Sequence, residues 1–135
     1  MTWTAPDVER PENYPARRND PELEMLRDWL DWHRATLLRK CAGLDATRLA
    51  SRAVPPSHLS LLGLVRHMSD TERGWIRQCR AVDAALEGAK LDDTVTFREK
   101  PTSLRWIWQH LVEEYARHNG HADLLREAID GSAGL

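Results

Sequence analysis

The sequence predicts an all-α protein, and two observations support that prediction. Long segments repeat apolar residues at steps of three and four, which is the period of an amphipathic helix, and none alternates apolar and polar residues as a half-buried strand does. None of the seven prolines falls in the interior of the three helices that these segments define. We expect one helical domain over residues 1–135, because this length supports a single core and not two.

Composition excludes several classes of function. The formal net charge is −2, so there is no basic excess for nucleic acid or for an anionic membrane surface. No run of 18 apolar residues occurs, so no membrane-spanning helix is expected. The N-terminus lacks the apolar core of a signal peptide. We therefore expect a cytoplasmic protein in which Cys41 and Cys79 are reduced, buried thiols.

Residues 1–20 hold three of the seven prolines and predict an extended arm. Trp3 and Tyr14 are the candidates for attaching this arm to the body of the protein, and the alternative is a free arm.

The first helix is expected to begin at Asp20 and Pro21, an N-cap residue followed by proline at the first helical position, and to end near Leu44. Its inward face is predicted to consist of Leu23, Leu26, Trp29 or Leu30, His33, Leu37, Cys41 and Leu44. We interpret His33 as a hydrogen-bonded core residue, because a single histidine on an apolar face is more often that than a ligand.

Residues 45–57 predict a connection, since Pro55 and Pro56 force extended backbone. A second helix is expected from about residue 58 to 87, ended by Gly88. Its apolar face keeps one register throughout: Leu61, Val65, Met68, Glu72, Trp75, Cys79, Val82 and Leu86. Residues 89–101 predict a polar loop, in which a short strand at 94–97 is conceivable but has no partner in the sequence.

The last helix is expected to start at Pro101 with Thr102 or Ser103 and to end near Asp130, before Gly131. Its apolar residues are Leu104, Ile107, Trp108, Leu111, Val112, Tyr115, Ala122 and Leu125. The same segment holds three of the six histidines in the chain. This concentration is the main indication of function.

Glu114 and His118 form the leading candidate pair for a metal, because residues at i and i+4 on a helix present their side chains to one point. A catalytic site needs about three protein ligands, and His67 on the second helix is the best candidate for the third. Two other pairs have suitable spacing: His110 with Glu114, and His118 with His121. The alternative interpretation is a solvated polar face without a metal.

Three segments resemble the DinB-like superfamily. They are RATLLRKCAGL at 34–44, PPSHLSLLGLVRHMSDTERGW at 55–75 and SLRWIWQHLVEEYARHNGHADLLREAIDG at 103–131. The resemblance is strongest to a branch of unknown function related to mycothiol-dependent maleylpyruvate isomerase and to bacillithiol and mycothiol S-transferases. It implies an up-down-down-up four-helix bundle carrying a divalent metal.

Carried over residue by residue, the resemblance implies His67, Glu114 and His118 as the metal ligands. His121, His110 and Glu72 would then be residues around the ligands or substrate contacts. Zinc is the first expectation for the metal, with nickel, iron or manganese as alternatives. The resemblance also implies a small-molecule thiol and an electrophile as substrates. Arg105, Trp106 and Arg117 are weaker candidates for contacts with an anionic partner.

One departure from the family pattern affects the expected architecture. The second and third helices of the family are fused here, since GWIRQCRAVDAALEG continues the second helix without a turn. Three long helices remain, and we expect a homodimer to complete the four-helix bundle. The alternative is a three-helix monomer.

The sequence leaves three functions open. The first is a metal-dependent thiol S-transferase or isomerase in detoxification. The second is a non-enzymatic interaction or stress-response module whose metal site is structural or vestigial. The third is a ligand-binding protein without a metal. An open coordination position beside a pocket would favour the first, and a fourth protein ligand, such as His121, would favour the second.

Overall fold

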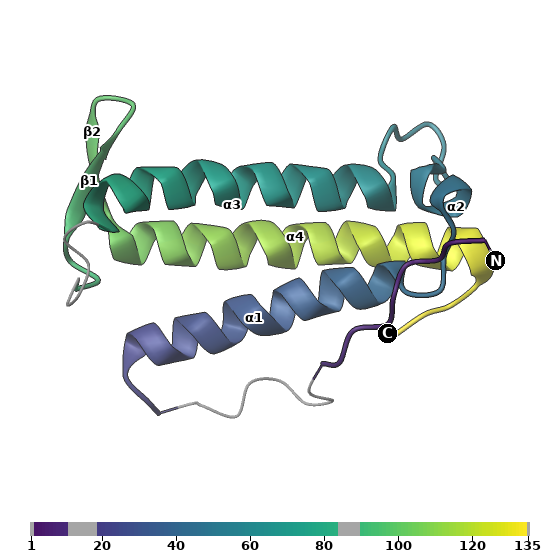
Figure 1. The fold of residues 1–135 in the computed structure, drawn as a ribbon, viewed down its shortest axis with the longest axis horizontal. Helices are drawn as coiled ribbons and strands as arrows, with labels where there is room; N and C mark the ends of the chain where they lie inside the picture. The colour runs from purple at the N-terminus through teal and green to yellow at the C-terminus, as the bar shows by residue number, and fades with distance from the viewer. Residues whose placement is uncertain (1, 11–18, 84–89, 135) are drawn as a thin grey trace.

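The computed structural model describes residues 2–10, 19–83 and 90–134, with only the backbone described for 76–83. Within these ranges it confirms a helical protein (Figure 1). The elements in chain order are α1 (Glu22–Cys41), α2 (Ala46–Ala50), α3 (Leu61–Asp83), β1 (Thr94–Phe97), β2 (Lys100–Ser103) and α4 (Leu104–Asp130). No helix in the described ranges combines the length and apolar character needed to cross a membrane.

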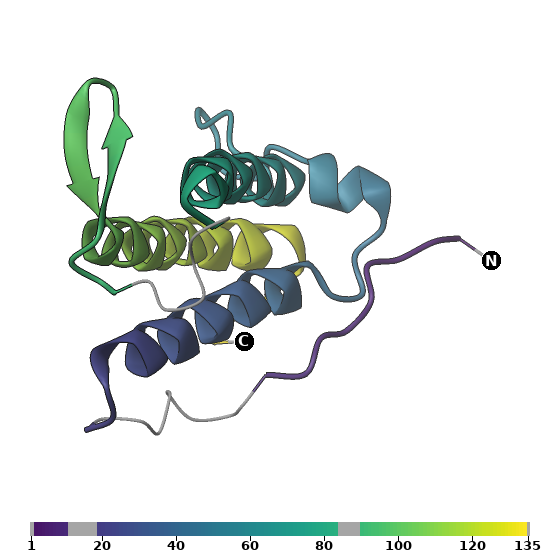
Figure 2. The same cartoon turned by 60° about the vertical axis from the view of Figure 1, so that its left-hand side comes forward.

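The three long helices lie side by side, with α4 between α1 and α3 in both views (Figures 1 and 2). In Figure 1, α1 and α4 run in the same direction and α3 runs in the opposite one. The core consists of the apolar faces of these helices, and its most completely buried side chains are Leu30, Leu44, Leu61, Met68, Ile107 and Leu125. The predicted stripes of the three helices therefore face one another.

α3 runs without a break from Leu61 to Asp83, as the sequence predicts for this part of the chain. It begins later than residue 58, because Ser60 accepts a hydrogen bond from Gly63 and thereby starts the helix. The predicted continuation to residue 87, including Leu86, lies outside the described residues, as do the side chains of Cys79 and Val82.

α1 begins one residue later than expected. Pro21, rather than Asp20, occupies the N-cap position, and no side chain caps the helix there. The helix ends at Cys41, before Leu44, because a turn of chain containing Gly43 at φ 74° follows it. The predicted inward face is confirmed from Leu30 onward, where the side chains are buried.

The segment expected to be only a connection contains the short helix α2. Asp45 caps it by accepting a hydrogen bond from the backbone N–H of Arg48. Leu49 from this helix is buried in the core. α2 was not predicted, because a helix of about one and a half turns is too short to show a repeat of apolar residues at helical spacing.

The prediction that the strand at 94–97 has no partner is wrong. β1 pairs antiparallel with β2, in a register that places Phe97 opposite Lys100. Arg98 and Glu99 form the two-residue turn, with φ of 47° and 65°. A turn with positive φ at both positions normally uses asparagine, aspartate or glycine, so this sequence carries no turn signal. Figure 2 shows the hairpin standing out from the α3–α4 end of the molecule.

α4 stops where the sequence predicts, but it starts at Leu104, because Pro101 and Thr102 belong to β2 and not to the helix start. Ser103 caps it by accepting a hydrogen bond from the backbone N–H of Trp106. Gly131 adopts the left-handed conformation that ends a helix. Its apolar stripe is confirmed by the burial of Leu104, Ile107, Leu111, Tyr115, Ala122 and Leu125.

The described part of the N-terminal arm packs on the body, although not through the predicted residue. Trp3 is 61% exposed, and Tyr14 lies outside the described residues. The contacts come instead from the backbone of Ala5, which bonds with Gly43 and Leu44. Further along, the Arg10 guanidinium donates to Thr36, and it lies 4.7 Å from the ring centre of Trp32.

Two of the three buried polar residues of α1, His33 and Lys40, have partners on α4. Asn119 donates to the backbone oxygen of His33 at 3.0 Å, and its amide nitrogen lies 3.2 Å from Nδ1 of the same residue. This confirms that His33 is a hydrogen-bonded core residue. Lys40 pairs with Asp123. Cys41 is a free, buried thiol, and burial raises its pKa to about 11.

Candidate metal centre

The three predicted ligands lie together between α3 and α4. One nitrogen or oxygen atom from each of His67, Glu114 and His118 lies within 4.8 Å of the others. Oε2 of Glu114 is 3.7 Å from Nε2 of His67 and 3.4 Å from Nε2 of His118. Ligands that share one tetrahedral zinc ion, with bonds of about 2.0–2.2 Å, lie about 3.3–3.6 Å apart. The donor set and its spacing therefore fit a divalent ion.

Local helix geometry and helix packing each position part of this cluster. Glu114 and His118 are one turn apart on α4, so their side chains project from the same face. His67 comes from α3, which runs beside α4 in the opposite direction. The rings of His67 and His118 are 4.7 Å apart between centres and nearly perpendicular. The helix pairing thus brings together residues that are distant in the sequence.

The cluster is buried on the α4 side and open on the α3 side. The side chains of His118 and Glu114 are 14% and 16% exposed, whereas that of His67 is 50% exposed. Burial, with a smaller contribution from the neighbouring His67, lowers the pKa of His118 below its ordinary value. The neutral imidazole, which is the form that binds metals, is therefore favoured at this residue.

His121 contacts His118 on the side away from Glu114. The Nδ1 atoms of the two rings are 3.2 Å apart. When Nδ1–H of His118 donates to His121, the lone pair at Nε2 of His118 points to the cluster. His121 is therefore placed to orient a ligand, and it is not one of the three clustered residues in the described part of the chain.

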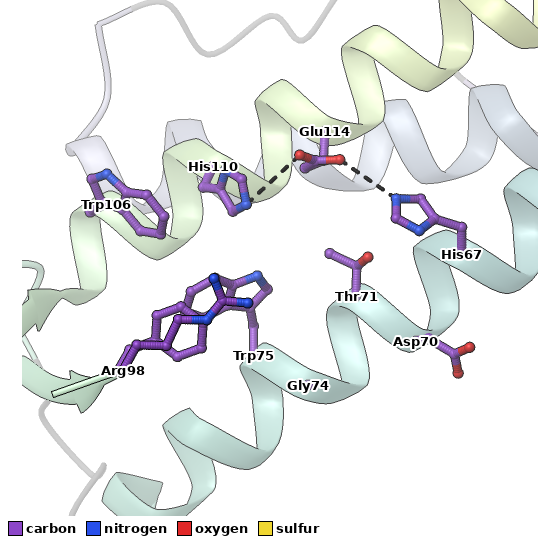
Figure 3. A pocket seen from close by; sticks show the side chains of 10 residues that line it. His67, Asp70, Thr71, Gly74, Trp75, Arg98, Trp106, His110 and Glu114 are labelled. Carbon is purple, nitrogen blue, oxygen red and sulfur yellow. Dashed lines mark ion pairs between the residues drawn. The ribbon is translucent and has the colours of Figure 1, made fainter. Parts of the chain in front are cut away.

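His110 lies on the other side of Glu114. Its Nε2 is 3.8 Å from Oε1 of Glu114, and its ring stacks on Trp106 at 4.7 Å between centres. Figure 3 shows Glu114 between His110 and His67. Oε1 of Glu114 thus faces His110, whereas Oε2 faces His67 and His118.

Glu72 is held elsewhere, in a network that joins three helices. Its carboxylate accepts hydrogen bonds from Nε and Nη2 of Arg34, at 2.7 and 3.0 Å. Burial first, and then a hydrogen bond with Glu72, raises the pKa of Tyr115. The structure does not bring Glu72 to the three candidate ligands.

A pocket of about 600 Å³ opens beside the candidate ligands. His67 and Glu114 line one end, and Trp75, Arg98 and Trp106 line the other (Figure 3). Phe97 also lines the pocket, with its ring centre 4.3 Å from that of Trp75. The hairpin supplies Phe97 and Arg98, so β1 and its turn form part of the pocket wall. Of the other basic candidates, Arg105 pairs with Glu22 and Asp92, and Arg117 pairs with Glu113.

Comparison with protein-family models finds a match to one family. The family model of mycothiol S-transferase matches the chain in two regions, residues 25–81 and 76–131. The chain belongs to the mycothiol S-transferase family, a DinB-like family. The two regions matched by the mycothiol S-transferase model overlap at residues 76–81, within the continuous helix α3. No curated protein and no solved structure matches significantly.

Three residues of the pocket wall in this mycothiol S-transferase family member, Trp75, Phe97 and Arg98, were not predicted as site residues, whereas Trp106 was. Trp75 was recognised only as a core residue, and it is 8% exposed. Phe97 and Arg98 were placed in a loop without a role. A signal for Phe97 was available, because an aromatic residue in a short polar segment next to a helix start requires a packing partner. No sequence signal indicated where Arg98 would point.

Proposed function

We propose that this protein is a divalent-metal-dependent S-transferase that joins a small-molecule thiol to an electrophile. The observation that supports this proposal is a cluster of three ligands with a pocket directly beside it. A catalytic metal site has three protein ligands and an open position, whereas a structural site is closed by a fourth. The cluster in the described residues has three members, which favours the enzyme over a module with a structural metal.

His67, Glu114 and His118 would hold the ion. Two imidazoles and one carboxylate suit zinc first, and nickel, iron or manganese as alternatives. When bound, the ion would lower the pKa of the thiol and hold it as a thiolate, the nucleophilic form. Family membership supports mycothiol or a related thiol as the co-substrate.

The surrounding residues would bind and orient the reactants. His121 fixes the ring of His118 through the Nδ1 contact, and His110 lies against the second oxygen of Glu114. Trp75 and Trp106 give the end of the pocket away from the ligands an apolar surface. An electrophile that packs on this surface would have one face shielded from water.

The proposal is tested by metal content and by conjugation rate on the same samples. Full-length protein without a histidine tag is incubated in turn with zinc, nickel and manganese, and bound metal is measured by elemental analysis. Conjugation of 1-chloro-2,4-dinitrobenzene with mycothiol or bacillithiol is then followed. We expect one ion per binding cluster and a rate above the uncatalysed reaction.

His118→Ala should remove most of the bound metal and the conjugation activity. His58→Ala is the matched control, because His58 is exposed and contacts Arg52 rather than the cluster. Wild-type protein that stays metal-free with all three ions would contradict the metal site. Metal-loaded protein that never exceeds the uncatalysed rate with either thiol would contradict the transferase.

A further inference from the structure

An aromatic wall, formed by Trp75, Phe97 and Trp106, lines the end of the pocket that faces away from His67. The ring centres of Trp75 and Phe97 are 4.3 Å apart, and those of Trp75 and Trp106 are 5.5 Å apart. Trp106 is 49% exposed although it is large and apolar. Aromatic rings that remain accessible in a pocket offer flat surfaces on which another ring can stack.

Arg98 stands beside the aromatic wall at the tip of the hairpin. Its guanidinium carbon lies 5.1 Å from the ring centre of Phe97, and Arg98 lines the pocket (Figure 3). Within the described ranges, no carboxylate forms an ion pair with Arg98. The other arginines near the pocket differ in this respect, since Arg73 pairs with Asp70 and Arg105 pairs with Glu22 and Asp92. Arg98 is thus a cation available to a ligand.

The hairpin end of the pocket carries the positive charge of Arg98. A second hollow of about 510 Å³, lined by Phe97 and Trp106, adds Lys100 to this basic end. At the other end, Asp70 pairs with Arg73, and Glu114 is one of the residues that would hold the ion. An anionic group on a substrate would be attracted to the hairpin, and the ion is the competing cation that the Arg98 variants below distinguish.

We infer that the electrophile is a planar aromatic molecule that carries an anionic group, such as a carboxylate. Its ring stacks on the aromatic wall, its anionic group pairs with Arg98, and its reactive carbon faces His67 and Glu114. Arg98 is therefore a specificity-determining residue. This inference rests on the proposed function for the reaction, and its binding part can be tested without the reaction.

For an aryl chloride the transfer step is balanced without any further reactant. The thiolate sulfur forms a bond with the ring carbon that bears chlorine, and the carbon–chlorine bond breaks. Chloride leaves with the electron pair of that bond, and the thiol proton goes to solvent. No oxidant or reductant takes part.

Calorimetric titration of the full-length, zinc-loaded protein, without thiol, tests the binding. The probes are 4-chloro-3-nitrobenzoate and its neutral isostere 4-chloro-3-nitrobenzamide. We expect the carboxylate to bind about tenfold more tightly or better, because a charge-assisted hydrogen bond has roughly that effect. Arg98→Gln should abolish the difference, and Arg98→Lys should retain most of it.

Two controls match these variants. Arg66→Gln removes the same charge from the exposed side of α3, outside the pocket lining, and should leave the preference unchanged. Trp106→Leu should weaken both probes, whereas Trp3→Leu, at an exposed tryptophan outside the pocket, should weaken neither. Equal binding of the two probes by the wild type would overturn the inference. So would a carboxylate preference that persists in Arg98→Gln, since the anion would then bind elsewhere, for example at the metal.

The outcomes separate this inference from the proposed function. If the protein binds the carboxylate preferentially but conjugates it with no thiol, the proposed transferase activity is contradicted. The inferred class of ligand, an anionic aromatic molecule, then still holds. Conjugation of both probes at equal rates, each relative to its uncatalysed reaction, would keep the transferase and overturn the role of Arg98.

Discussion

Arg34 in α1 donates two hydrogen bonds to Glu72 in α3, from Nε at 2.7 Å and from Nη2 at 3.0 Å. The two helices lie on opposite sides of α4, so this pair connects the outer helices directly. The carboxylate also forms a hydrogen bond with Tyr115 of α4. The network therefore ties all three long helices together.

We predict that Arg34→Met lowers the free energy of unfolding by about 1–3 kcal/mol, because Glu72 would be left half-buried without its charged donor. Urea unfolding measures the change. Arg117→Met is the matched control, since Arg117 pairs with Glu113 at an exposed i, i+4 position and should change stability by less than about 0.5 kcal/mol. Equal effects of the two substitutions would show that the Arg34–Glu72 pair is no stronger than a surface pair.

We predict that His121→Ala weakens metal binding by about 10- to 100-fold without removing the site. His121 holds the ring of His118 and is not in the ligand cluster, and loss of such an orienting partner has an effect of that size. Competition with a chelator of known affinity measures the change for zinc. Glu72→Gln should leave the affinity within about twofold, because Glu72 belongs to the Arg34 network. A larger loss from Glu72→Gln than from His121→Ala would reverse these two assignments.

We predict that His33 makes the protein less stable below about pH 6.5. Burial lowers the pKa of His33 in the folded state below its ordinary value of 6.5. Above that value the residue is neutral in both states, and it has no effect on stability. As the pH falls through 6.5, the unfolded chain takes up a proton that the folded chain does not. The free energy of unfolding then decreases, by at most about 1.4 kcal/mol per pH unit.

Urea unfolding at about pH 7.5 and about pH 5.5, for the wild type and His33→Gln, checks this prediction. Glutamine keeps an amide beside Asn119 but does not titrate in this range. The wild type should lose more stability than the variant on acidification. An identical pH dependence of the two proteins would show that His33 titrates equally in both states.

We predict that the protein is a homodimer in which a partner supplies the fourth helix of the bundle. α3 continues without a turn to Asp83, so the described part of the chain contains three long helices, whereas the resemblance to the DinB-like superfamily implies four. Exchange of an identical element between two chains would complete each bundle at low cost. Light scattering behind a sizing column should give twice the chain mass of 15.5 kDa. A single monomer mass at tens of micromolar protein, roughly where a standard interface should hold, would exclude the dimer.

The sequence by itself determined the long helices and the pair on α4. Helical periodicity depends on residues three and four apart, and these interactions form within one segment. The caps of α4 at Ser103 and Gly131 are local for the same reason. Glu114 and His118 share a face wherever that helix packs, so their pairing required no tertiary information. His67 could be added as a candidate from its place on the second helix.

Only the tertiary structure decided the pocket and the polar networks. The turn at Arg98 and Glu99 has none of the residues that favour positive φ, so the hairpin exists through its pairing and packing and not through a local signal. Glu72 lies on the predicted apolar stripe of α3. Because α1 lies against that part of α3, Glu72 accepts hydrogen bonds from Arg34 of α1. Phe97 meets Trp75 because β1 of the hairpin packs beside α3. These contacts join segments that are far apart in the chain. The spacing of residues within one segment does not show which side chain of a distant segment will contact it.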